Sequence, residues 1–386
     1  MSQRCLPLPL LALAAGLLVP ATAPAASIPA GFYSTDSVPA KHGLMIQSMK
    51  ISGGSLPKAG KSTAVLYSST APDGSIVPVS GVVTIPKGKA PKGGFPVISW
   101  AHGTTGIADS CAPSKIVTDA PTNDYVKNFQ AETTHWVKEG YVVAQTDYQG
   151  LGTAGMHPYL IGTGEGRSVI DIVSAARGLD KRVGKTWAAI GHSQGGHAAL
   201  WAAALAKSYA PGLRLKGAVP LAPGTHIGEQ AELARNLDSN PLGGLPALIV
   251  ASIAANQGIA PETVFSDAAM ALYPQIEQVC LDKLSQQDSF GGLSLKAHFR
   301  EGADFAPAIA AISANDPEDL TIPVPLLIAQ GTADAVAFPT YTDQTVADYK
   351  GRKMKVTYKT YEGVDHSDVV AASRKDADKF LDKVLG

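Results

Sequence analysis

The sequence predicts an α/β protein whose mostly parallel central sheet is flanked by helices and interrupted by an inserted helical cap. Three short runs near the N-terminus are rich in β-branched residues and partly alternate, which predicts an antiparallel meander. From residue 96 onward, compact apolar runs without alternation are followed by helical stretches, which is typical of parallel strands buried on both faces. Residues 225–321 break this rhythm with helix-like patterns and no clear strand, which indicates the cap.

The expected elements follow the chain in that order. The meander comprises residues 44–51, 62–69 and 76–85. Later strands are expected at residues 96–101, 141–146, 187–190, 215–221, 325–329 and 354–361. Helices are expected at residues 123–138, 166–180, 194–209, 340–350 and 368–384. The chain is thereby divided into a signal peptide (1–26), a first core part (27–224), the helical cap (225–321) and a second core part (322–386).

Composition and net charge indicate the class of protein and argue against some kinds of partner. Of the 386 residues, 45% are hydrophobic and 17% charged, which fits a globular protein. The net charge of -1 argues against nucleic-acid binding, because phosphate recognition needs concentrated Lys and Arg. Basic clusters along the chain, such as Arg352-Lys353, are short and interrupted, so no polyanion partner is expected.

The N-terminus predicts export. Residues 1–26 contain one Arg, an apolar run and then small residues, the pattern of a cleaved secretory signal. A membrane anchor is disfavoured because the run is short and contains Pro. The mature protein is therefore expected to be secreted, either extracellular or periplasmic. It would keep Cys111 and Cys280, which either form one disulfide or remain two buried thiols.

The segment Gly191-His192-Ser193-Gln194-Gly195 is a G-x-S-x-G motif between an expected buried strand and a small-residue helix. The chemistry needs a tight strand-to-helix turn that lifts the Ser hydroxyl clear of the sheet. Side chains at 191 and 195 would collide with the backbone there, so both are Gly. Ser193 is therefore the expected nucleophile.

A Ser nucleophile needs a base and an orienting acid, each on a loop after a later strand. Asp334 follows the strand at 325–329, and His366 follows the last strand. Both loops lie at the edge of the sheet where Ser193 is expected. Of the nine His residues, His366 alone meets both order and position, with His298 in the cap a distant second. Asp365 adjoins His366 in sequence, which makes its approach to the imidazole awkward, so Asp334 is preferred.

An oxyanion hole would complete this arrangement. One donor is expected to be the backbone N–H of Gln194, directly after the nucleophile. The second is expected from the loop His102–Gly106, with Thr104 favoured and Thr105 next. The segment Gly150–Gly155 also matches G-x-G-x-x-G, but no suitable helix or acidic strand end follows it. It is interpreted as a glycine loop beside the site. No CxxC or HExxH motif occurs, and no cofactor or metal is expected.

These motifs together resemble the α/β-hydrolase fold and, more narrowly, the secretory lipase family, over about residues 40–380. They are HGTTG, DYQGLG, GHSQGG, GTAD and DH in this order, with a CAPS run at residues 111–114 that makes the resemblance more specific. The family implies a helical cap, or lid, and a disulfide that joins the region after the oxyanion loop to it, which Cys111 and Cys280 fit. His192 and Gln194 differ from the elbow of the yeast members and resemble the bacterial branch. The resemblance therefore implies ester hydrolysis more strongly than it implies lipase activity on long-chain substrates.

The sequence thus predicts an exported serine carboxylic-ester hydrolase that acts on a small-molecule or lipid ester and needs no nucleic acid and no obligatory protein partner. Three alternatives stay open: an esterase for cell-wall esters, a serine peptidase on the same fold, and a non-catalytic binding module. The apolar cap segment Ala247–Ala255 either packs wholly into the core of the cap or lines an acyl channel with one face.

Overall fold

The computed structural model describes residues 28–116 and 124–386, so the predicted signal peptide lies outside the described residues. Its centre is a nine-stranded sheet with the order β1-β2-β3-β5-β4-β6-β7-β8-β9. The strands are β1 (Met45–Ile51), β2 (Gly60–Thr70), β3 (Ile76–Pro86), β4 (Phe95–Ala101), β5 (Val142–Gln149), β6 (Val183–His192), β7 (Arg214–Leu221), β8 (Leu326–Gly331) and β9 (Val356–Tyr361). The pairs β1–β2, β2–β3 and β3–β5 are antiparallel. All other neighbouring strands in the sheet are parallel. The predicted mostly parallel sheet with an antiparallel meander is confirmed.

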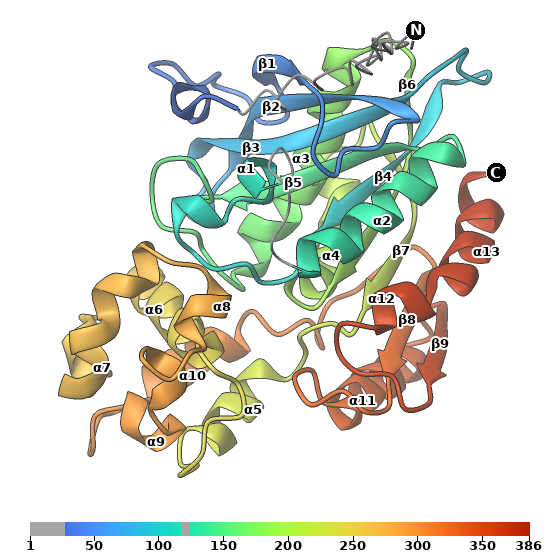
Figure 1. Ribbon diagram of the computed structural model, residues 1–386. Coiled ribbons are helices and arrows are strands. Elements are labelled where there is room, and N and C mark those ends of the chain that lie inside the picture. Colours follow the sequence, from blue (N-terminus) through green and yellow to red (C-terminus); the bar gives the residue numbers. More distant parts are fainter. Residues whose placement is uncertain (1–27, 117–123) are drawn as a thin grey trace, which may run out of the picture.

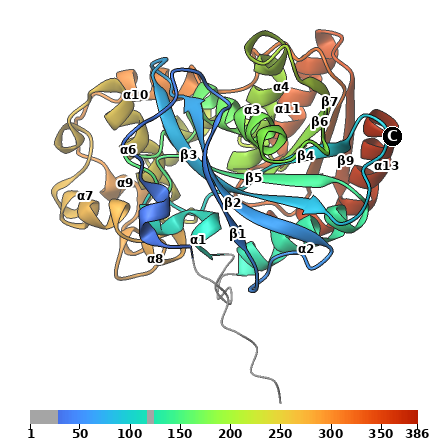
Figure 2. The same cartoon turned by 90° about the horizontal axis from the view of Figure 1, so that it is seen from above.

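Helices cover both faces of this sheet (Figures 1 and 2). They are α1 (Pro113–Ile116), α2 (Asp124–Lys138), α3 (Gly162–Leu179), α4 (Gln194–Tyr209), α5 (Ile227–Ala234), α6 (Leu245–Gln257), α7 (Asp267–Leu272), α8 (Leu281–Leu284), α9 (Leu295–His298), α10 (Ala306–Ser313), α11 (Pro339–Gly351), α12 (Val369–Ala372) and α13 (Arg374–Leu385). Side chains of β4 alternate between the two layers. Val97 and Ala101 join the apolar cluster that contains α3 and α4, whereas Ile98 and Trp100 join the cluster that contains α2 and α13. Burial on both faces explains why this strand shows no polar alternation.

Two helices differ from the expectation. Helix α3 begins at Gly162 rather than at residue 166, although its first turn is rich in glycine. A Cβ atom at Gly162 would lie 2.1 Å from the Trp201 ring, so glycine is needed there for the close packing of α3 on α4. The single helix expected at 368–384 is divided into α12 and α13. At the break, the Ser373 hydroxyl donates to the Val370 carbonyl, a local side-chain bond that competes with the helical pattern.

The helices α5–α10 follow β7 and precede β8, within the range in which the cap was predicted. Figure 1 shows them, yellow to orange, gathered beside one end of the sheet. They share an apolar cluster of their own, whose fully buried members include Leu248, Phe265 and Phe290. The segment before α3 contributes Tyr159 to the same cluster, which joins the inserted helices to the core.

In the described residues, no helix is long and apolar enough to cross a membrane.

A disulfide forms a second connection between the inserted helices and the core. Cys111 and Cys280 are bonded, with their Cα atoms 5.5 Å apart, as the family resemblance implies. Cys111 is fully buried, and Cys280 directly precedes α8. The bond closes a loop of 169 residues.

We expect the double variant Cys111→Ser/Cys280→Ser to lose stability, because an open loop of this length gains conformational entropy in the unfolded chain. The chain-entropy relation gives about 5 kcal/mol as an upper figure. Urea unfolding of both proteins measures the loss. Peptide mapping without reduction should show the two cysteines in one linked peptide, and two alkylatable thiols would contradict the bond.

Candidate active site

Ser193 lies in the sharp turn between β6 and α4. Its backbone φ of 57° and ψ of -119° fall in a region that non-glycine residues rarely adopt, and such strain concentrates at functional sites. A Cβ atom at Gly191 would lie 2.0 Å from the Gly195 carbonyl oxygen, and one at Gly195 would lie 1.9 Å from the Ala101 oxygen. Both glycines are therefore required by close backbone contacts, as the motif predicted.

The structure brings Asp334 and His366 together on the loops after β8 and β9. His366 Nδ1 and Asp334 Oδ2 are 2.8 Å apart. The other carboxylate oxygen accepts the backbone N–H groups of Val336 and Ala337, each at 2.8 Å. Burial alone would raise the pKa of Asp334, but the hydrogen bond and charge of His366 and these two N–H groups outweigh it and lower the pKa. The carboxylate is thus held ionised against one nitrogen of the imidazole.

The two other residues weighed for these positions lie elsewhere. Asp365 is exposed, and its carboxylate accepts the backbone N–H groups of Ser367 and Asp368, so it closes the turn after His366. His298 is buried among the inserted helices, with Nε2 2.9 Å from the Phe290 carbonyl oxygen. Among the described residues, Asp365 makes no hydrogen bond to the His366 ring, and His298 has no carboxylate partner of the kind that His366 has in Asp334.

His192 connects the turn at Ser193 to the His366 loop. Its Nε2–H donates to the His366 carbonyl oxygen at 2.7 Å, and the two rings lie 4.7 Å apart between centroids. Burial and the neighbouring His366 lower the pKa of His192 to about 3, so the ring stays neutral. Within the described residues, no hydrogen bond joins the Ser193 hydroxyl itself to His366. In unliganded enzymes such bonds are often long and tighten when substrate binds.

The residues predicted as oxyanion donors come from two parts of the chain, the start of α4 and the loop after β4. Gln194 is the first residue of α4, where backbone N–H groups have no acceptor within the helix. The Thr104 hydroxyl lies 2.6 Å from the hydroxyl of Tyr159, which lines the same pocket as Ser193. Thr105 is instead tied to the inserted helices, since its carbonyl accepts the N–H of Leu281 at 2.9 Å.

A buried polar cluster next to Ser193, around the side chain of Gln194, was not predicted. The Gln194 amide donates to Glu165 Oε1 at 2.7 Å and lies 2.8 Å from His157 Nε2. The other Glu165 oxygen lies 3.1 Å from His197 Nδ1, while His197 Nε2 donates to the Asn315 carbonyl at 2.8 Å. Burial alone would lower the pKa of His197, but Glu165 outweighs it and raises the pKa. The contacts of His197 with Glu165 and Asn315 link α3, α4 and the segment after α10.

The DYQGLG and CAPS motifs meet in another buried network. Asp147 accepts the backbone N–H and the hydroxyl of Ser114, and also the hydroxyl of Ser80. A Cβ atom at Gly152 would lie 2.9 Å from the Tyr33 ring, so the glycine loop after β5 is tightly packed. These contacts agree with its interpretation as a structural loop. In the part of the chain that the structure describes, no three His, Cys, Asp or Glu side chains are grouped to hold a metal ion.

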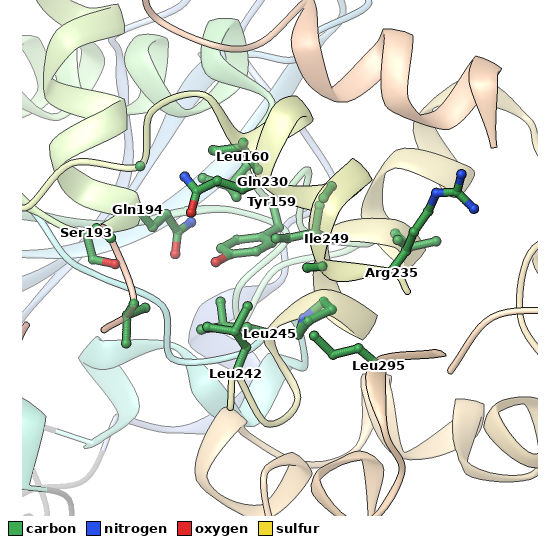
Figure 3. A pocket seen from close by; sticks show the side chains of 18 of the residues that line it. Tyr159, Leu160, Ser193, Gln194, Gln230, Arg235, Leu242, Leu245, Ile249 and Leu295 are labelled. Carbon is green, nitrogen blue, oxygen red and sulfur yellow. The ribbon is translucent and has the colours of Figure 1, made fainter. Parts of the chain in front are cut away.

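An apolar pocket opens beside Ser193 (Figure 3). Its lining is mostly aliphatic and comes largely from the inserted helices: Leu160, Ile227, Leu242, Leu245, Ile249, Val250 and Leu295. Figure 3 shows Ser193 and Arg235 at opposite ends of the labelled side chains. Arg235 is the one charged residue of the lining among the described residues, and its guanidinium pairs with Glu232 at 2.7 Å.

Helix α6 contains the apolar cap segment for which two alternatives were stated. Ile249 and Val250 line the pocket, and Val250 is also buried in the apolar cluster of the inserted helices, as are Leu248 and Ile253. The segment therefore packs into this cluster and also lines part of the pocket. That the pocket takes an acyl chain stays a prediction.

Two known proteins are similar in sequence to parts of this chain. The chain is 29% identical over 206 residues to a probable inactive lipase of Mycobacterium tuberculosis, covering 52% of this chain and 44% of that protein. It is 34% identical over 83 residues to lipase A of Moesziomyces aphidis, covering 21% of this chain and 17% of that protein. The chain thus spans less than half the length of either relative.

Solved structures extend the likeness to almost the whole chain. The rice cell wall degrading esterase LipA from Xanthomonas oryzae superposes with a TM-score of 0.73 at 21% identity, over 89% of this chain and 98% of that one. Candida antarctica lipase A gives 0.72 at 19% identity, over 88% and 83%. Both likenesses show the α/β-hydrolase fold. The sequence model of the secretory lipase family matches residues 128–377. The protein therefore belongs to the secretory lipase family of lipase- and esterase-type hydrolases.

Proposed function

We propose that this protein is an exported serine carboxylic-ester hydrolase in which Ser193, His366 and Asp334 form the catalytic triad. One observation carries the proposal. The strained turn presents Ser193 to an apolar pocket, at the same edge of the sheet as the hydrogen-bonded pair of His366 and Asp334. This combination supplies a nucleophile, a base and an orienting acid.

The reaction follows from the roles of these groups. Asp334 accepts the Nδ1–H of His366, which leaves Nε2 free to take the proton of the Ser193 hydroxyl as its oxygen attacks the acyl carbon. The N–H groups of Thr104 and Gln194 would receive the oxyanion, each contributing about 3 kcal/mol. His366 then protonates the leaving alcohol, and an acyl-enzyme on Ser193 remains. Water, deprotonated by His366, attacks this ester and releases the acid.

The pocket favours an ester with an aliphatic acyl chain. Its side chains are mostly hydrocarbon, and each CH₂ group that leaves water contributes about 0.8 kcal/mol. A peptidase that selects a basic side chain or a free amine would need a carboxylate here. Among the described residues that line the pocket there is none, which supports ester over peptide hydrolysis.

The proposal is tested by hydrolysis of p-nitrophenyl esters from acetate to palmitate. Rates on triacylglycerol emulsions and on feruloyl esters, measured in parallel, distinguish a lipase from a cell-wall esterase. Turnover that disappears in the Ser193→Ala variant is the expected result. Because one relative is named a probable inactive lipase, the assay must include the Ser193→Ala variant as the baseline for zero enzymatic turnover. Wild-type rates equal to this baseline on every ester would refute the proposal and favour a non-catalytic binding module.

The proposal includes export. The pattern of residues 1–26 and the disulfide between Cys111 and Cys280 both fit an oxidising compartment. N-terminal sequencing of protein secreted by the native host should begin at residue 26 or 27.

Two positions one turn apart on α6 predict two different mutant phenotypes, because Ile249 lines the pocket and Ile253 does not. Ile249→Asp places a charge in the pocket, so kcat/KM should fall at least tenfold more for the octanoate ester than for the acetate, with little change in Tm. Ile253→Asp buries a charge in the apolar cluster, so stability should fall by about 3 kcal/mol or more and both substrates should suffer together. Equal losses on both esters at unchanged Tm in Ile249→Asp would contradict the assignment of the pocket.

A further inference from the structure

A second hollow lies at the other edge of the sheet, far from Ser193. It has a volume of about 530 Å³ and is lined by the hairpin between β1 and β2 and by the turn between α3 and β6. Arg182 in that turn directly precedes β6, and Ser193 directly follows it. The ten residues of this strand separate the two positions by about 33 Å. A ligand in this hollow would leave the pocket beside Ser193 open.

The hollow is strongly basic. The lining includes the exposed residues Lys50, Lys58 and Lys61 and the half-buried Arg182. Among the described lining residues the one carboxylate is Asp180, and it is already paired with Arg182 at 2.7 Å. In the described part of the chain, none of the three lysines makes an ion pair with a carboxylate. Lys61 also acts on Asp180 through its charge, so four positive side chains of the lining face one carboxylate.

The loop between β3 and β4 and the turn between α3 and β6 extend this basic surface. They add the exposed residues Lys87, Lys89, Lys92 and Lys181. Hydrogen bonds hold the loops together, since Lys87 Nζ donates to the Lys58 carbonyl at 2.8 Å and Arg182 donates to the Gly88 carbonyl at 3.0 Å. We call the hollow and these loops the basic edge. It contrasts with residues 225–321, where Asp and Glu outnumber Lys and Arg.

We propose that the basic edge binds an acidic polysaccharide, whose carboxylates pair with the lysines while its sugar rings lie in the hollow. Several separated lysines suit a chain of repeated charges better than one small anion. The hollow also contains aliphatic side chains, among them Leu56, Ile85 and Leu179, which can cover the C–H faces of sugars. Serine and threonine hydroxyls line it as well and can hydrogen-bond to sugar hydroxyls.

Two other polyanions fit less well. Single-stranded nucleic acid is bound by stacking on aromatic rings, and the described lining of the hollow contains none. A membrane surface is usually anchored by exposed apolar side chains as well as by charge. In the described residues, the large exposed apolar side chains are Leu44, Leu233, Leu237 and Phe338, none of which lies in these loops.

Binding of the intact mature protein to polygalacturonate, with neutral galactan as the uncharged comparison, tests the proposal. We expect retention on polygalacturonate alone, weakening as salt rises towards about 0.15 M. The variant Lys50→Gln/Lys58→Gln/Lys61→Gln should bind about tenfold more weakly or worse. Lys296→Gln/Lys375→Gln/Lys379→Gln removes the same charge from exposed residues that do not line the hollow, and should bind like the wild type. Tm and p-nitrophenyl acetate hydrolysis should stay unchanged in both variants.

Three results would overturn the proposal. The first is no preference of the wild type for polygalacturonate over galactan. The second is equal weakening in the two triple variants, which would show a response to net charge alone. The third is binding to phosphatidylglycerol vesicles or to DNA without binding to polygalacturonate, which would assign the basic edge to another class of partner. None of these results depends on ester hydrolysis.

Discussion

Replacing Ser193 with Ala should lower kcat/KM for p-nitrophenyl esters by at least about 10³-fold, because the acyl-enzyme can no longer form. Alanine fits the turn, since only the hydroxyl is removed, so Tm should change little. Ser367→Ala removes a hydroxyl from an exposed residue next to His366 and should keep wild-type activity. If Ser193→Ala retains more than about a tenth of the activity, Ser193 is not the nucleophile.

Asp334→Asn should lower kcat by about 10⁴-fold. The amide presents the wrong hydrogen-bonding partner to His366 Nδ1, so the imidazole is held in the tautomer that cannot accept the Ser193 proton at Nε2. Asp365→Asn is the matched control, because it makes the same chemical change one position before His366 and should reduce kcat only a few-fold. The loss in Asp334→Asn should persist across the pH range above the lowered pKa of the native carboxyl. The reverse order of the two variants would assign the acid to Asp365.

Local patterns predicted the parts of this molecule that depend on local structure. The turn at Ser193 could be predicted from its two glycines, of which Gly191 is required by Gly195, four residues further on. Gly195 is required by Ala101 of β4, a contact that the motif predicts only through its known structural context. The positions of Asp334 and His366 followed from the order of parallel strands, which places their loops at one edge. Strand β4 was recognised because burial on both faces removes polar alternation.

Long-range packing explains what could not be predicted. The glycines at the start of α3 resemble a loop, and the Trp201 ring that requires Gly162 lies on another helix. The cluster around Glu165 joins His197 to Asn315, which is more than a hundred residues further along the chain. The position of His197, four residues after Ser193 at the start of a small-residue helix, could have indicated a buried polar group. Its partners depend on how α3 and the inserted helices meet.

The basic edge illustrates the same limit for charge. No polyanion partner was expected, because basic residues are scattered along the sequence. Lys58, Lys87 and Arg182 come from three separate segments, and hydrogen bonds in the folded chain bring these segments together. Clusters along the chain were therefore a poor guide to clusters on the surface.

Covalent trapping tests the central claim most directly, namely that Ser193 is an activated nucleophile. The wild-type protein is treated with diethyl p-nitrophenyl phosphate, which transfers its diethylphosphoryl group to an activated serine and releases p-nitrophenolate. We predict one group per chain, located on Ser193 by peptide mapping, with esterase activity lost in proportion to labelling and no label in Ser193→Ala. An esterase-active protein that stays active without label, or that carries the label on another residue, would contradict the account.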